Sequence, residues 1–301
     1  MRSISQPGPP APERIQWVEA RGRAFSFTLE AGVPLLEAAR RGFAAEGFAG
    51  GTLRITSGAL GPFAYVMPAL SRTGENAAFY SDIYRPAGIT RLKTAAMTLG
   101  ARDGAPFFHC HALWREADGR VNGGHILPEE TMVAEPFEVD AFGLDGARFT
   151  AEPDPETNFR LFGPTAFSSE GTPGLRDVRP AGVRTPRRAF ALRLRPNQDF
   201  AGALESFCRS QGIFHARLHG GVGSTIGARF TDGRSVVPFA TELAVRSGMI
   251  GPGAGGTLEA ELDIALVDYL GGLAEGRLMR GDNPVLMTME LVLEVLDEET
   301  R

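Results

Sequence analysis

The chain contains an internal repeat, and this repeat constrains its fold more than any other feature. Residues 23–29, RAFSFTL, return 165 positions later as residues 188–194, RAFALRL. The same offset aligns Gly58-Ala59 with Gly223-Ser224, and near the end of each copy an offset of 152 aligns Glu138-Val139 with Glu290-Leu291. The offset falls because the first copy has a longer middle section. A chain of 301 residues is long enough for two domains of about 150 residues each, so we predict two diverged copies of one domain.

Each copy begins with a strand pattern followed by a helix pattern. Residues 23–29 alternate as a strand does, and residues 33–46 place Leu35, Ala39 and Phe43 on one helical face before Gly47 ends the helix. Short segments then follow, separated by Gly, Pro or Asp turns. They are residues 52–57, 63–67, 76–84, 91–99, 106–116, 119–126 and 132–142. The pattern predicts an α/β protein of the α+β type, with a mostly antiparallel sheet and one main helix in each copy.

Composition divides the chain further and limits its possible roles. Residues 1–14 hold four prolines and are predicted to be a flexible tail, while residues 146–186 are rich in Pro, Gly and charge and are predicted to be a linker. The two domains then span residues 15–145 and 187–301. A net charge of −5 disfavours DNA as a partner, and no apolar run is long enough for a membrane span. Two cysteines, Cys110 and Cys208, fit a reducing compartment, so we expect a cytoplasmic protein.

Three of the five histidines lie close together in the first copy. His109 and His111 are two apart, so on a strand both imidazoles leave from the same face and Cys110 points the other way. Asp118-Gly119 is a hairpin signal that can return His125 beside them. Three nitrogen ligands with an open fourth position suit Zn²⁺ first, and Ni²⁺, Co²⁺ or Fe²⁺ next. The alternatives are a solvated polar face or an imidazole cluster in a groove between subunits. His215 and His219 are expected to be structural or surface residues.

These motifs together resemble the PPC domain, the plants-and-prokaryotes-conserved domain. The resemblance is carried by the strand-helix start, by His109-x-His111, and by Asp118-Gly119 followed by Gly123-Gly124-His125. It implies compact domains that assemble as trimers, with His109, His111 and His125 as metal ligands. His109-x-His111 followed by Glu116 and Gly123 also resembles the first motif of the cupins, but the second cupin motif is missing.

The two copies depart from the family in complementary ways. The first keeps the histidines but has residues 94–97, TAAM, in the expected place of a Glu-Ile-Leu strand. The second keeps Glu242-Leu243-Ala244 but has Glu261, Asp263 and Arg277 at the histidine positions. An arginine between two carboxylates can replace a cation between ligands. We therefore expect a charged network and no metal in the second copy.

Three functions follow as hypotheses. The first is a metal-binding homo-oligomer, a trimer by the resemblance, that binds a small ligand or a protein partner. The second is a DNA-binding protein by family association. That role would need a basic face, formed by Arg184, Arg187, Arg188, Arg193 and Arg195, or an AT-hook, of which Arg21-Gly22-Arg23 lacks the following proline. The third is a metal-dependent hydrolase or lyase with Glu116 beside the metal as a base, and with Glu129 and Glu138 as other candidates.

Overall fold

The computed structural model describes residues 1–168 and 185–297. In the first copy the elements are β1 (Ile15–Leu29), α1 (Leu35–Ala45), β2 (Gly51–Ile55), β3 (Gly58–Leu60), β4 (Tyr65–Val66), β5 (Pro68–Ala69), β6 (Phe79–Tyr80), β7 (Thr90–Arg102), β8 (Ala105–Arg115), β9 (Val121–Ile126), β10 (Val133–Glu135), β11 (Phe137–Asp154) and β12 (Phe159–Phe167). In the second they are β13 (Arg187–Leu194), α2 (Phe200–Ser210), β14 (Ala216–Arg229), β15 (Ser235–Pro252), the short 3-10 helix Ala254–Gly256, β16 (Leu258–Asp268), β17 (Leu273–Arg277) and β18 (Val285–Val295).

The predicted α+β class is confirmed, and the repeat is visible in the element order. Helices α1 and α2 occupy positions 35–45 and 200–210, which is the 165-residue offset of the sequence. Each helix follows the first strand of its copy and covers its own apolar core. Both copies have a mostly antiparallel sheet, because short strands joined by tight turns pair with their neighbours in sequence.

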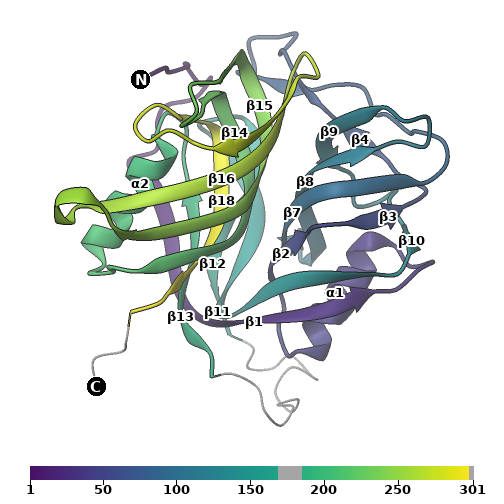
Figure 1. Ribbon diagram of the computed structural model, residues 1–301, viewed down its shortest axis with the longest axis horizontal. Coiled ribbons are helices and arrows are strands. Elements are labelled where there is room, and N and C mark those ends of the chain that lie inside the picture. Colours follow the sequence, from purple (N-terminus) through teal and green to yellow (C-terminus); the bar gives the residue numbers. More distant parts are fainter. Residues whose placement is uncertain (169–184, 298–301) are drawn as a thin grey trace.

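The described strands of both copies join in one sheet through β1, except β5 and β6, which pair with each other. The main path of this sheet runs β17-β16-β15-β14-β18-β13-β1-β11-β2-β7-β8-β9-β4. The first half of β1 pairs with β13, from Ile15 against Leu194 to Gly22 against Arg187, and its second half pairs with β11. In Figure 1 the sheet curves so that the purple-to-teal first copy and the green-to-yellow second copy face each other across the molecule.

Small side chains allow these two halves of the sheet to approach closely. Ala96 on β7 packs in a buried cluster with Val222 and Ala244 of the second copy. Thr52 donates a hydrogen bond of 2.6 Å from its Oγ1 to the backbone oxygen of His219. The contact between the copies is therefore made by close backbone approach, which only small residues permit.

The predicted linker is wrong for its first part. Strand β11 continues to Asp154, and β12 folds back against it from Phe159 to Phe167, so residues 146–167 form a hairpin. Two of its charged residues, Asp154 and Glu156, are buried because they are paired. Asp154 accepts hydrogen bonds from Arg193 of β13 and from Arg195 just after it, and Glu156 pairs with Arg14. The rest of the predicted linker, residues 169–184, lies outside the described residues.

The predicted flexible tail also needs correction. Residues 1–14 have no regular secondary structure, but they run along the molecule and hydrogen-bond to both copies. Ile4 exchanges hydrogen bonds with the side chain of Asn197, and Arg14 forms an ion pair of 2.9 Å with Glu156. Proline removes backbone donors from this segment, so side chains and single backbone groups hold it in place. Within the described ranges, neither helix is long and apolar enough to cross a membrane.

Candidate metal centre

The three predicted histidines meet on one face of the sheet. His109 and His111 project from β8, and His125 lies directly opposite His111 on β9. One ligand atom of each imidazole lies within 4.8 Å of the others, and His111 and His125 are buried. Cys110 points to the opposite face into the core, where burial raises the pKa of its thiol. Strand alternation and the hairpin therefore produce the convergence that the spacing predicts.

The second copy supplies the groups that orient this cluster. Nδ1 of His109 lies 2.9 Å from both carboxylate oxygens of Glu290 on β18, and Nδ1 of His111 lies 3.0 Å from the backbone oxygen of Leu243 on β15. Carboxylates and carbonyls accept hydrogen bonds, so both Nδ1 atoms carry the proton. The cluster thus lies at the junction of the two copies, with its outer partners on strands distant in sequence.

This arrangement leaves two lone pairs facing each other. An imidazole that carries its single proton on Nδ1 has an acceptor at Nε2, and the Nε2 atoms of His109 and His111 lie 3.0 Å apart. Burial, with the neighbouring histidines, holds the pKa of His111 well below its usual range. A cation between the two nitrogens satisfies both.

Glu242 on β15 is a further group at the site. One of its carboxylate oxygens lies 4.0 Å from Nε2 of His111, and the other is buried without a hydrogen-bond partner. Burial raises the pKa of Glu242 well above its usual value. Nδ1 of His125 is likewise buried without a partner. Three imidazoles with an adjacent carboxylate form a donor set that suits a divalent transition metal, and these unsatisfied atoms fit such an ion.

Glu116, predicted to lie beside the metal, contacts other groups instead. Its Oε1 accepts hydrogen bonds from Tyr65 at 3.1 Å and from Asn122 at 2.7 Å. It follows His111 by five strand positions, which at about 3.3 Å per residue separates them by about 16 Å. The carboxylate that lies beside the histidines is that of Glu290, which the sequence analysis did not predict. The one sequence feature that pointed to Glu290 was its alignment with Glu138 in the repeat.

The equivalent positions of the second copy face solvent. Arg277 pairs with Glu261 at 3.0 Å, and both side chains are exposed, whereas Asp263 accepts a hydrogen bond from Arg246. Strand register also corrects the first copy. Gly58 pairs with Leu92 as Gly223 pairs with Leu243, so the position equivalent to Glu242 is Arg91 and not residues 94–97. The first copy therefore keeps the histidines, the second keeps Glu242, and these groups face each other.

The arginines considered for DNA do not form a basic face. Arg193 and Arg195 are buried against Asp154, and Arg187 and Arg188 lie near Glu294 and Glu19. Arg184 lies outside the described residues. Arg21, Gly22 and Arg23 belong to strand β1, where all three pair with β11 and the first two also pair with β13.

Fold and site together define a two-domain α+β protein with a three-histidine cluster between its domains. Residues 182–297 match the model of the Plants and Prokaryotes Conserved (PCC) domain, the family called PPC above. The second copy is therefore a domain of this family, and the predicted resemblance is confirmed.

Solved structures similar to this chain each cover about half of it. A plant- and prokaryote-conserved protein of Pyrococcus horikoshii is 19% identical, with a TM-score of 0.38 over 48% of this chain and 94% of its own. A metal-containing protein of Archaeoglobus fulgidus is 20% identical, with a TM-score of 0.37 over 47% and 94%. A Bacteroides thetaiotaomicron protein whose name suggests DNA binding is 12% identical, with a TM-score of 0.35 over 46% and 90%. No curated protein matches the chain significantly.

Proposed function

We propose that this chain is a metal-binding module whose His109, His111 and His125 hold one divalent transition metal ion, Zn²⁺ or a related ion, at the junction of its two copies. The observation that carries the proposal is the 3.0 Å separation of two Nε2 acceptors whose Nδ1 atoms are already hydrogen-bonded. Such outer hydrogen bonds are typical of metal-binding histidines, because they select the tautomer and hold the ring in place.

The second copy would act as the outer shell of the first copy's ligands. Glu290 orients His109, and Glu242 lies where it can approach the ion or a water bound to it. A bound metal acts there as a Lewis acid that attracts an oxygen donor to its open position. Because the ligands and their partners come from different copies, metal binding would also stabilise the junction. Assembly of such chains into a trimer is proposed from the family resemblance alone.

Elemental analysis of the purified protein tests the proposal directly. We expect one equivalent of a transition metal per chain, and an increased thermal midpoint when Zn²⁺ is added back to chelator-treated protein. At a free metal concentration 100 times the dissociation constant, binding stabilises the native state by about 2.7 kcal/mol. Absence of metal after purification, together with no stabilisation by added Zn²⁺, Ni²⁺, Co²⁺ or Fe²⁺, would refute the proposal.

Glu290→Gln should weaken metal binding without preventing folding. Glutamine keeps the size of the side chain but removes the charge that supports the His109 imidazole, and loss of an outer-shell partner typically reduces metal affinity by about 10- to 100-fold. The affinity can be measured by competition with a chromophoric chelator.

Glu294→Gln is the matched control for Glu290→Gln, because Glu294 lies on the same strand and pairs with His219, outside the cluster. The control should retain the wild-type affinity. Equal affinities in all three proteins would show that Glu290 does not support the metal site.

A further inference from the structure

A cavity lies beside the histidines, and a bound metal ion would not occupy it. It has a volume of about 320 Å³, and His109, His125 and Glu290 are among the residues that line it. Apolar side chains form most of its wall, with Phe107 and Phe162 among them, and Arg102 and Arg160 also line it. This volume and this mixture of an apolar wall with few polar groups are typical of small-molecule sites.

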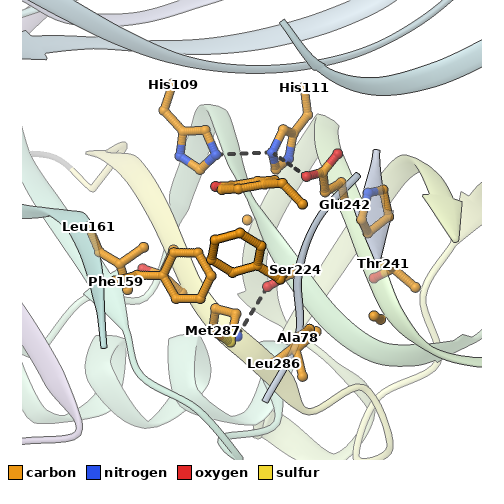
Figure 2. A pocket seen from close by; sticks show the side chains of 16 residues that line it. Ala78, His109, His111, Phe159, Leu161, Ser224, Thr241, Glu242, Leu286 and Met287 are labelled. Carbon is orange, nitrogen blue, oxygen red and sulfur yellow. Dashed lines mark hydrogen bonds and ion pairs between the residues drawn. The ribbon is translucent and has the colours of Figure 1, made fainter. Parts of the chain in front are cut away.

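A second, smaller cavity also adjoins the cluster, and it shares His109, Phe159 and Leu161 with the first. It holds about 50 Å³, and Figure 2 shows His109, His111 and Glu242 at one end of it, with Phe159, Leu161 and Met287 further in. Three of the four residues with hydroxyl groups that line it already use them in hydrogen bonds. Ser224 accepts from the backbone N–H of Met287, Thr241 donates to the backbone oxygen of Thr225, and Thr288 accepts from Arg193. Glu242 and the hydroxyl of Tyr80 are left for a ligand here, and the volume admits only a small fragment.

The larger cavity is built by segments that the second copy lacks. Ile83 and Tyr80 come from the longer middle section of the first copy, and Phe159 to Phe162 come from the β11–β12 hairpin. The Tyr80 ring meets the His125 ring edge-on, with centroids 5.4 Å apart. The middle section and the β11–β12 hairpin cover the histidine cluster of the first copy. The equivalent positions of the second copy have no such cover. The enclosure is therefore specific to the intact site.

The charged groups of the cavity favour an acid. Arg102 lies over the ring of Phe107, 4.7 Å from its centroid, and its nearest carboxylate, that of Asp103, is 4.0 Å away. Arg160 pairs with the same aspartate at 2.6 Å, so two guanidinium groups share one carboxylate. Of the two glutamates in the lining, Glu290 is engaged by His109, and Glu129 is exposed, as the two arginines are. Arginine binds carboxylates through two parallel hydrogen bonds.

We infer that the cavity binds a small organic acid, with its carboxylate at Arg102 and Arg160, its apolar body against Phe107 and Phe162, and an oxygen donor directed at the metal. This inference rests on the proposed function for the metal end of the ligand. Arg102 and Arg160 are about half exposed, so each can be replaced without opening the core.

Two synthetic probes test the metal-binding end and the carboxylate-binding end of the site separately. Benzohydroxamate offers a metal-binding head on an apolar ring, and 4-carboxybenzohydroxamate adds a carboxylate at the far end. In calorimetric titrations of the metal-loaded protein we expect the carboxylated probe to bind about 10-fold more tightly, which corresponds to about 1.4 kcal/mol. Arg102→Gln/Arg160→Gln should lose this advantage, so that it binds the two probes with equal affinity. Arg85→Gln, which changes an exposed arginine paired with Glu130, is the control and should retain the advantage.

The outcomes distinguish the inference from the proposed function. If the protein holds one metal ion but binds both probes equally, or neither, the inference of an organic-acid site is wrong and the proposed metal site stands. A protein that holds no metal, yet still binds the carboxylated probe with the same dependence on the two arginines, supports the acid site and overturns the proposed function.

Discussion

The protein with His109→Ala and His111→Ala should purify without stoichiometric metal, whereas the wild type should carry one equivalent per chain. The double replacement removes two of the three ligand nitrogens and leaves His125 alone, and one imidazole cannot hold a transition metal tightly. Elemental analysis of both proteins measures the difference. His215→Ala is the matched control, because His215 is exposed and pairs with Asp297 away from the cluster.

The fold of the variant must be checked beside its metal content. Alanine leaves Glu290 without its imidazole partner, so some loss of stability is expected at the junction. The second copy has its own apolar core and should remain folded, which circular dichroism and urea unfolding can show. An unchanged metal content in a folded variant would place the metal elsewhere.

Replacing Asp154 with alanine should reduce the free energy of unfolding by about 3–5 kcal/mol, because it leaves two buried arginines without their shared carboxylate. Asp154 accepts from Arg193 and Arg195 through one oxygen and from the backbone N–H of Glu156 through the other. Urea unfolding measures the loss. Asp140→Ala removes an exposed ion pair with Arg54 and should cost less than about 1 kcal/mol; equal effects of the two would show that the buried network contributes no more than a surface pair.

The contribution of Asp154 should also depend on pH. Burial acts to raise the pKa of Asp154, but Arg193 and Arg195 outweigh it, and the pKa is lowered from 3.8. A carboxyl whose pKa is lower in the folded state stabilises that state fully above its unfolded value, and this stabilisation is lost as pH falls through the folded value. The pH-dependent part of the difference between the wild type and Asp154→Asn should therefore be constant above about pH 5 and shrink below about pH 4.

Features that depend on local pattern could be read from the sequence. The helix predicted over residues 33–46 is observed as Leu35–Ala45, because its apolar spacing and Gly47 are neighbours along the chain. The same holds for the histidines. His109 and His111 share a face through strand alternation, and one tight turn returns His125, so their meeting involves only 17 residues of chain.

Charged residues misled the prediction where distant partners neutralise them. The segment after Asp145 has the composition of a linker, yet it forms a hairpin because Asp154 meets arginines about 40 residues further along. Composition records how many charges a segment has, and burial depends on whether each charge finds a partner. The N-terminal segment was misjudged for a related reason, since Ile4 is held by Asn197, 193 residues away.

The sequence by itself determined that there are two copies of one α+β domain, that one copy keeps three converging histidines, and that the other keeps a glutamate strand. Only the tertiary structure decided that the histidines of the first copy and the glutamate strand of the second face each other. The pairing of β1 with β13 joins the sheets, small residues let them close together, and Glu290 then reaches His109 across 181 residues of chain. No periodicity links residues so far apart, because their approach is set by the packing of whole sheets and not by the conformation of any one segment.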